Sequence, residues 1–198
     1  GIFNDRISGE LNAYKTNTTD LLLNRTISPV HGINSITQNI GETQNTGLEF
    51  SLNSRIIEKS KFQWTLSGNL AYEKNEIVSL YGIKDESGNE VDDVVNSWFI
   101  GKPIRVIYDF VWDGTWQLDE AAEAASWGSQ PGFVKLRDVN KDGKLTADDK
   151  QIIGQQDPNL LWGLTNSFSY KNFKLDIFIH GVHGVTKNLF PLMTDLET

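Results

Sequence analysis

The sequence predicts an all-β chain whose long antiparallel strands form part of a large transmembrane β-barrel. Several segments alternate apolar and polar side chains with a period of two, which is typical of strands with one apolar and one polar face. Most of these segments run for about ten residues or more, which is long for a soluble sheet and suits a tilted membrane strand. Very short turns alternate with long loops, as periplasmic turns and extracellular loops do in outer-membrane barrels.

The alternation places strands near the ranges 3–16, 45–57, 61–74, 160–170 and 173–183. In the third of these, the apolar stripe begins with Phe62 and Trp64 and ends with Tyr72, with aliphatic residues between them. Aromatic residues at both ends of a stripe are expected where a strand meets the two membrane interfaces. Taken alone, this strand fits a soluble β-sandwich equally well.

The remaining long segments are predicted to be loops, at 18–44, 75–103 and 113–157. The long loops of a barrel lie on its extracellular side. A single membrane-crossing strand at 104–113 would put the second and third loops on opposite sides. We therefore expect that Ile104–Trp112 does not cross the bilayer as an ordinary strand and belongs to a substructure above it, unless a further strand lies within 76–103.

The composition excludes several classes of protein. The chain has 198 residues and a net charge of −8, which argues against a nucleic-acid partner, because phosphate binding requires clustered Lys and Arg. It contains no Cys, so neither disulfides nor thiol catalysis is expected. No apolar run approaches 18 residues, and strand-like alternation begins within the first ten residues. We therefore expect a fragment of a longer protein.

The residue patterns of common enzymes are also missing. No Ser-His-Asp order, Gly-rich phosphate loop or HExxH motif occurs. Adjacent carboxylates such as Asp148 and Asp149 are not the spaced acid and base of a glycosidase. His180 and His183 are three apart in a strand and therefore point to opposite faces, which argues against a shared zinc ion. The sequence predicts no enzymatic activity.

The twelve residues from Asp138 to Asp149 have the spacing of an EF-hand calcium loop. Oxygen-bearing side chains stand at its positions 1, 3, 5, 9 and 12, and Gly143 stands at position 6. Ca²⁺ takes about six to eight oxygen ligands, and the pattern supplies them. The shorter Asp149 replaces the usual Glu at position 12. The expected ligands, with Lys144 acting through its backbone carbonyl, are Asp138, Asn140, Asp142, Lys144, Thr146 and Asp149.

The same loop also fits a turn that caps a helix. Thr146 and Asp149 have the spacing of a capping box for a short helix over 147–153, and Gly154 would end it. A capped turn and a calcium site are compatible with each other. We therefore expect one short helix after the EF-hand-like loop.

Four tryptophans in or beside the long loops are candidates for contact with a ligand or partner. Exposed indole rings could stack on sugar faces or contact a protein that covers the barrel, whereas buried rings would fill the loop cores. These residues are Trp98, Trp112, Trp116 and Trp127.

Motifs in three parts of the chain resemble one family when they are taken together. They are Lys15 to Leu23 with Asn45-Thr46-Gly47-Leu48-Glu49; Trp112-Asp113-Gly114-Thr115-Trp116; and the calcium pattern followed by Ile152-Ile153-Gly154, Asp157-Pro158-Asn159 and Leu161-Trp162-Gly163. Their order resembles the C-terminal barrel portion of the SusC/RagA-like TonB-linked outer-membrane transporters of Bacteroidetes.

The resemblance implies a location in the Gram-negative outer membrane and the import of oligosaccharides or peptides. It further implies a SusD-like surface lipoprotein as partner. It also implies an N-terminal plug domain and a TonB complex that acts through the N-terminal part, both absent from this sequence. The alternative is a soluble secreted calcium-binding β module for carbohydrate binding or adhesion. A dockerin-like module is less compatible, because dockerins carry two tandem calcium loops and this chain has one.

Overall fold

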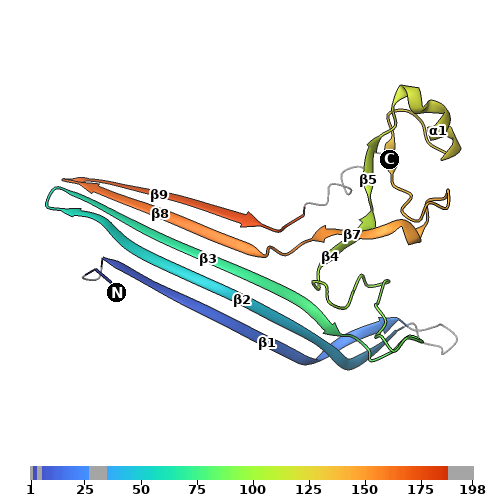
Figure 1. Ribbon diagram of the computed structural model, residues 1–198, viewed down its shortest axis with the longest axis horizontal. Coiled ribbons are helices and arrows are strands. Elements are labelled where there is room, and N and C mark those ends of the chain that lie inside the picture. The colour runs from blue at the N-terminus through green and yellow to red at the C-terminus, as the bar shows by residue number, and fades with distance from the viewer. Residues whose placement is uncertain (1, 4–5, 27–34, 187–198) are drawn as a thin grey trace. The chain divides into compact units, whose positions relative to one another are not determined.

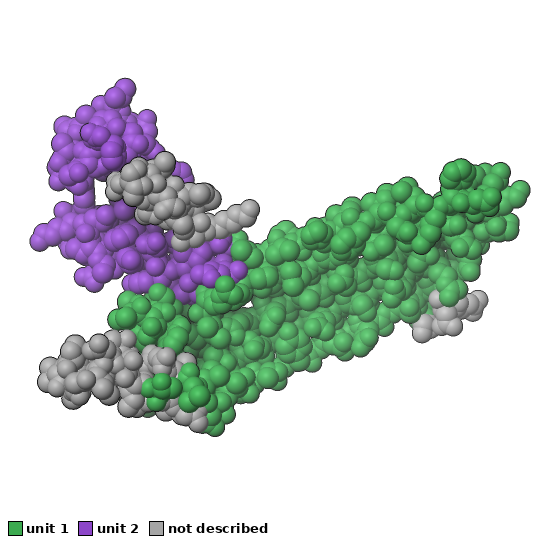
Figure 2. Space-filling view, turned by 180° about the vertical axis from the view of Figure 1, so that it is seen from behind, with its two compact units in different colours: residues 1–105, 157–185 green, residues 106–156, 186–198 purple. Residues whose placement is uncertain are grey.

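The computed structural model describes residues 2–3, 6–26 and 35–186. They fall into two compact units, coloured separately in Figure 2. The first comprises residues 1–105 and 157–185, and the second comprises residues 106–156 and 186–198.

The first unit is built on a five-stranded antiparallel sheet (Figure 1). Its strands, in spatial order, are β1 (Ile7–Thr26), β2 (Ser35–Lys59), β3 (Phe62–Ser79), β8 (Leu160–Tyr170) and β9 (Phe173–His183). Two-residue connections join β2 to β3 and β8 to β9. The sheet is therefore a meander, interrupted by a long insertion between β3 and β8.

The strands β8 and β9 have the ranges expected from the sequence. The three others extend beyond their expected ends, β2 also begins earlier than expected, and β1 begins at Ile7 instead of residue 3. The prediction of a loop over 18–44 is wrong at both ends, because residues 18–26 and 35–44 continue β1 and β2 and pair with each other. The middle of that loop, 27–34, lies outside the described residues. A register shift between Thr18 and Leu21 disrupts the alternation, and Asp20 has a positive φ of 59°. Likewise, β3 continues to Ser79, beyond the predicted start of the next loop.

The second unit contains two small antiparallel pairs. β4 (Val106–Phe110) pairs with β7 (Lys150–Gln155), and β5 (Trp112–Thr115) pairs with β6 (Val134–Leu136). Its helical turns are η2 (Leu118–Glu120), α1 (Ala121–Ser126) and η3 (Ala147–Asp149). No helix in the described ranges is long and apolar enough to cross a membrane.

Ile104–Trp112 does not join the five-stranded sheet, as expected. Its strand β4 has five residues and pairs with β7, whereas β3 pairs directly with β8. Tyr72 lies opposite Leu160, so the chain leaves and re-enters the sheet at the same end. Residues 80–159 therefore connect two strand ends that lie at the same end of the sheet.

The helix expected over 147–153 is shorter than predicted. The capping box of Thr146 and Asp149 is present, but it caps only the single 3-10 turn η3. From Lys150 onward the chain forms β7, and Ile152 lies opposite Tyr108 of β4. The pairing with a strand some forty residues upstream overrides the local helix signal, and the β-branched Ile152 and Ile153 favour a strand.

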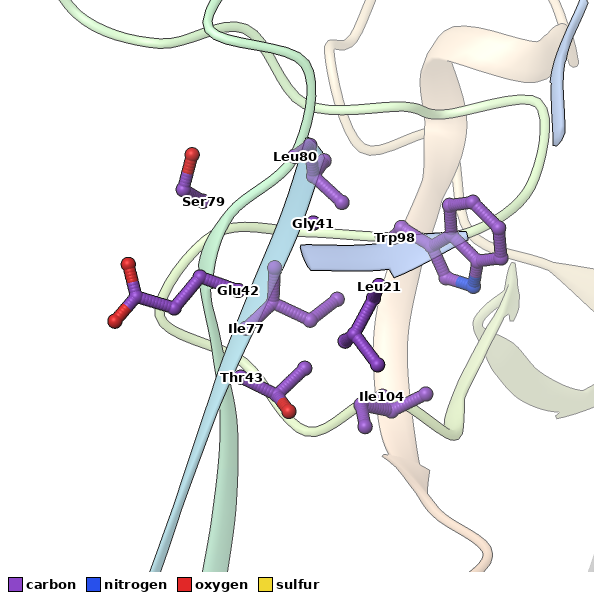
Figure 3. A pocket seen from close by; sticks show the side chains of 9 residues that line it. All are labelled: Leu21, Gly41, Glu42, Thr43, Ile77, Ser79, Leu80, Trp98 and Ile104. Carbon is purple, nitrogen blue, oxygen red and sulfur yellow. The ribbon is translucent and has the colours of Figure 1, made fainter. Parts of the chain in front are cut away.

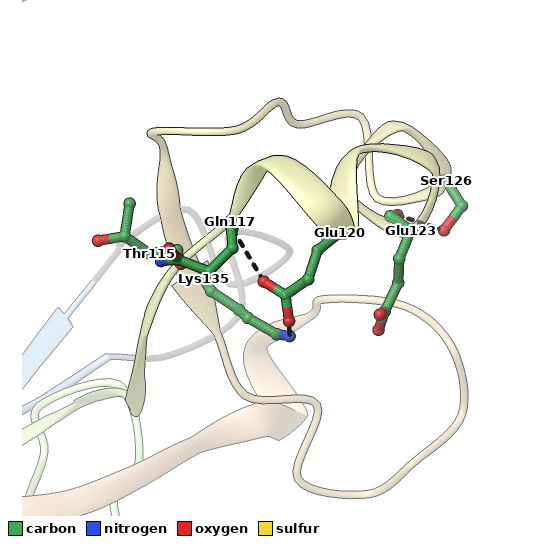
Figure 4. A network of polar contacts seen from close by, with 6 residues as sticks. All are labelled: Thr115, Gln117, Glu120, Glu123, Ser126 and Lys135. Carbon is green, nitrogen blue, oxygen red and sulfur yellow. Dashed lines mark hydrogen bonds and ion pairs between the residues drawn. The ribbon is translucent and has the colours of Figure 1, made fainter.

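A polar network anchors α1, which has too few residues to be stable alone (Figure 4). The Lys135 Nζ lies 2.7 Å from a Glu120 carboxylate oxygen and 4.2 Å from the centre of the buried Trp116 ring. The other Glu120 oxygen accepts a hydrogen bond of 2.9 Å from the Gln117 N–H. The hydrogen bond from Lys135 is the main reason that the pKa of Glu120 is lowered.

In the first unit, Glu90 organises the segment that follows β3. One oxygen of its carboxylate accepts hydrogen bonds from the N–H groups of Leu80 and Gly82, at 2.7 and 2.8 Å, and from the Ser79 hydroxyl at 3.2 Å. Leu80 itself is 2% exposed. Burial alone would raise the pKa of Glu90, but these hydrogen bonds outweigh it and hold the pKa below its ordinary value of 4.5.

We expect Glu90→Gln to loosen residues 79–82 at pH 7, because an uncharged amide accepts these hydrogen bonds more weakly. Hydrogen exchange at Leu80 and Gly82 in the full-length parent protein should accelerate about fivefold. The lowered pKa means that the stabilisation is present above the unfolded-state pKa and is lost as the pH falls through the folded-state pKa. Acidification below about pH 4 should therefore loosen the wild type toward the variant. Exposed Glu86 gives the control Glu86→Gln, and equal exchange in both variants would contradict this role for Glu90.

Candidate functional site

Most of the apolar side chains in the paired parts of the five strands lie on one face of the sheet. Residues directly opposite each other in an antiparallel ladder share a face, so the register alone defines rows across the sheet. One row runs Leu11, Phe50, Leu70 and Trp162 from β1 to β8. We call this surface the apolar face; its members are Ile7, Leu11, Ala13, Leu48, Phe50, Leu52, Ile57, Phe62, Trp64, Leu66, Leu70, Tyr72, Leu160, Trp162, Leu164, Phe168, Tyr170, Phe173, Leu175, Ile177 and Ile179.

The apolar face is bordered by aromatic residues at both ends. Near the β2–β3 turn lie Trp64 and Phe168, whose stacked rings are 5.6 Å apart, while Tyr72 and Trp162 lie near the other end. From Phe62 to Tyr72 the strand rises by about 33 Å, which gives a band about 25 Å tall at the usual barrel tilt of about 40°. This is the height of the lipid-facing band of an outer-membrane barrel.

Polar side chains define the limits of this face and occupy its reverse side. The next row beyond Tyr72 carries Lys15, Thr46 and Lys74. The reverse face of β3 carries Gln63, Thr65, Ser67 and Asn69. Asn166 interrupts the apolar face, but its Oδ1 accepts a hydrogen bond of 3.2 Å from the Trp64 indole N–H. The two faces of β3 thus differ in polarity, whereas the reverse face of β8 and β9 also carries Leu161, Phe178 and Val182.

The EF-hand-like loop folds around its own carboxylates and amides. The two Asp138 oxygens accept hydrogen bonds from the N–H groups of Lys141 and Gly143, at 2.6 and 2.9 Å. Asp142 Oδ1 accepts one of 2.9 Å from the Lys144 N–H, and Asn140 Oδ1 accepts one of 2.9 Å from the Asp142 N–H. Gly143 has a φ of +79°, the left-handed conformation expected at position 6.

Asp149 joins the two ends of this loop from a fully buried position. Its Oδ1 accepts a hydrogen bond of 2.9 Å from the Val139 N–H, and its Oδ2 accepts one of 2.8 Å from the Thr146 N–H. The hydrogen bond from Thr146 is the main reason that the pKa of Asp149 lies below its ordinary value, and the one from Val139 adds to it. The carboxylate at position 12 therefore stabilises the closed loop.

The donor atoms of this loop suit a hard cation. All six predicted ligands offer oxygen, the ligand atom that Ca²⁺ prefers, and a carboxylate oxygen that accepts one hydrogen bond retains a further lone pair. All of their side chains except that of Lys144 accept hydrogen bonds from backbone N–H groups. The described residues contain no group of three or more His, Asp or Glu placed to hold a metal ion. The donor chemistry thus fits Ca²⁺, while the arrangement is that of a hydrogen-bonded loop.

The four candidate tryptophans do not share one environment. Trp116 is 5% exposed and belongs to the core beside α1, whereas Trp112 is 63% exposed. Trp127 is half-buried in the second unit. Trp98 is half-buried in the first unit and lines a small apolar pocket with Leu21, Ile77, Leu80 and Ile104 (Figure 3). Among the four, Trp112 is the one with a largely exposed ring.

The structure also reveals a cluster of exposed aliphatic residues that sequence reasoning missed. Ile83, Val91, Val94 and Val95 lie in the segment after β3, together with Tyr81, Asp92 and Asp93. The adjacent valines beside adjacent aspartates were the sequence signal for this cluster. They lie in a stretch without strand or helix periodicity.

A family model described as "TonB dependent receptor-like, beta-barrel" matches residues 2–180. Among curated proteins, a TonB-dependent receptor of Formosa agariphila is 34% identical over 92% of this chain and 19% of the relative. The TonB-dependent receptor SusC of Bacteroides thetaiotaomicron is 31% identical over 87% of this chain and 17% of the relative. The chain thus spans about a fifth of the length of these relatives.

Solved structures agree with these relatives in fold. The RagAB peptide transporter matches 92% of this chain and 20% of the solved chain, with a TM-score of 0.64 and 23% identity. The RagAB peptide importer in its "open-open" state matches 92% of this chain and 19% of the solved chain, with a TM-score of 0.66 and 22% identity. The chain therefore belongs to the TonB-dependent receptor β-barrel family.

Proposed function

We propose that this chain supplies part of the wall and the extracellular loops of a transporter in the outer membrane of a Gram-negative bacterium. The apolar face carries this proposal, because it is continuous across five strands, bordered by aromatic residues and about 25 Å tall. A lipid-facing surface requires this combination, and it also requires that every backbone group be paired within the sheet. The reverse, polar face then lines the barrel lumen.

The proposed orientation puts the insertion 80–159 outside the cell. The two-residue connections lie at the opposite end of the sheet, as periplasmic turns do. On that side the insertion can meet cargo and a surface lipoprotein of the SusD type. A TonB complex would supply the energy through a part of the parent protein outside this sequence.

The cargo class follows from the relatives by analogy. We propose an oligosaccharide or a peptide, and the second class is supported by RagAB, a fold neighbour that is a peptide transporter. The family also argues against an enzymatic role. A soluble secreted calcium-binding module is not proposed, because the chain matches a membrane-barrel family over most of its length.

Leu164→Arg and Thr165→Arg distinguish the two faces of β8. Leu164 lies at mid-height on the apolar face beside Gly68 and Ile179, and Thr165 points to the other face. An arginine facing lipid near the bilayer centre costs about 2–4 kcal/mol, whereas one facing the lumen costs little. We expect only Leu164→Arg to reduce the heat resistance of the full-length parent in detergent and its recovery from the outer membrane. Equal behaviour of the two variants, or greater damage from Thr165→Arg, would contradict the proposed orientation.

We further propose that the loop from Asp138 to Asp149 binds Ca²⁺ as a structural ion. Its four carboxylates fall within twelve residues of the sequence, and a divalent cation would reduce their mutual repulsion. The ligands would be those predicted from the sequence. Their existing hydrogen bonds hold the backbone in the compact form that such a site requires.

Asp142→Ala and Asp138→Ala test this ion. We expect either variant to increase protease cleavage of residues 133–157 in the full-length parent, while the strands stay resistant. Removal of Ca²⁺ with a chelator should have the same effect on the wild type and little further effect on the variants. Exposed Asp148 gives the control Asp148→Ala. If added Ca²⁺ protects the wild type and the two variants equally, the loop is not the binding site.

A further inference from the structure

The segment that follows β3 forms an exposed groove with aliphatic walls, which we call the valine groove. Val95, Val94 and Val91 are 80%, 52% and 44% exposed. The groove is lined by Tyr81, Ile83, Val91, Asp92, Asp93, Val94 and Val95.

Backbone pairing brings these aliphatic side chains together. The Val91 N–H donates a hydrogen bond of 2.9 Å to the Ile83 carbonyl, which puts two chain segments side by side. Asp93 and Trp98 exchange two backbone hydrogen bonds of 2.9 Å, which closes a tight turn. Val94 and Val95 lie in this turn, where Ser97 has a positive φ of 58°. The groove therefore combines two neighbouring chain segments with the turn beside them.

Carboxylates hold this segment in its exposed form. Asp93 accepts hydrogen bonds of 2.5 Å from the Tyr81 hydroxyl and 2.7 Å from the Asn96 amide. Asp85 accepts the N–H groups of Ser87 and Asn89, both at 2.9 Å, and so closes the other turn. Together with Glu90, these contacts resist collapse of the valines onto one another. A surface that is already ordered loses little conformational entropy when a ligand binds.

The segment that forms the groove carries a net negative charge. Residues 80–98 contain one basic residue, Lys84, and five acidic residues, which gives a net charge of 1 − 5 = −4. Asp92 and Asp93 are part of the groove wall itself. Asp92 uses its Oδ1 to accept the Ile100 N–H at 2.7 Å. A ligand that pairs apolar side chains with positive charge is therefore complementary to this surface.

We propose that the valine groove binds an extended peptide in which Lys or Arg alternates with aliphatic residues, as an external capture site for cargo. This inference rests on the proposed function and narrows its cargo to cationic, apolar peptides. Sugar rings are recognised mainly by exposed aromatic faces, whereas this groove offers aliphatic walls, and its aromatic member Tyr81 is hydrogen-bonded to Asp93. Aliphatic walls beside carboxylates thus favour a peptide.

The test uses the full-length parent protein, purified from the outer membrane in detergent. Binding of the fluorescein-labelled heptapeptide Lys-Val-Leu-Lys-Val-Leu-Lys is measured by fluorescence anisotropy. The matched ligands are Glu-Val-Leu-Glu-Val-Leu-Glu, with the charge reversed, and maltoheptaose as a competitor. We expect saturable binding of the cationic peptide that weakens as the salt concentration rises, at least tenfold weaker binding of the acidic peptide, and no competition by the sugar.

Variants assign the binding to the groove. Asp92→Asn keeps an oxygen for the Ile100 N–H but removes the charge, and should weaken binding about threefold. The double variant Val94→Thr with Val95→Thr keeps the side-chain shapes and should weaken it about tenfold. The controls are Asp119→Asn and Val185→Thr, exposed residues outside the groove, and they should leave binding unchanged.

The inference is overturned if the cationic peptide does not bind, if the groove variants bind it as tightly as the controls do, or if maltoheptaose displaces it. Import by the same parent protein, and the recovery of that protein from the outer membrane, are measured in parallel. A parent that inserts and imports but binds no peptide through this groove refutes the capture site and leaves the transporter intact. A parent that does not reach the outer membrane refutes the proposed function whatever the groove binds.

Discussion

The continuous backbone ladder between β3 and β8 is the constraint on which the rest of the structure depends. It joins Phe62 to Tyr170 and Tyr72 to Leu160, residues far apart in the sequence, and so unites two meanders in one sheet. Closing so long a connection costs chain entropy, which eleven paired residues on each strand help to offset. Once this register is set, the apolar rows of the strands align, and the insertion 80–159 begins and ends at the same end of the sheet.

The strands were predictable where alternation was clean and side chains decided the pairing. β8 and β9 have that pattern from Leu160 to His183, and their ranges agree with the sequence prediction. Residues 18–26 of β1 and 35–44 of β2 lack that pattern, because they are rich in Thr and Asn and their register shifts near Asp20. Strand β7 could not be predicted from its local sequence. It follows a capping box, which favours a helix, and its pairing partner β4 lies more than forty residues upstream.

The candidate sites also differ in how well they could be predicted from the sequence. The loop from Asp138 to Asp149 is a local motif, so its turn and capping box could be predicted from spacing alone. The exposure of each tryptophan could not, because it depends on contacts such as that between Lys135 and Trp116. The valine groove depends on the carboxylates of Glu90 and Asp93, whose hydrogen-bond partners no periodicity reveals. Local motifs could be predicted from the sequence, whereas surfaces formed by tertiary contacts could not.

The central claim is that the apolar face contacts lipid and the reverse face contacts water. A nitroxide scan along residues 160–170 of the full-length parent, reconstituted in bilayers, tests it most directly. Each label's collision rate with oxygen, which concentrates in lipid, is compared with its collision rate with a water-soluble nickel complex. The account predicts a period of two, with oxygen favoured at Trp162, Leu164 and Phe168 and nickel favoured at Leu161, Thr165 and Ser167. Uniform exposure to nickel, or the opposite phase, would contradict it.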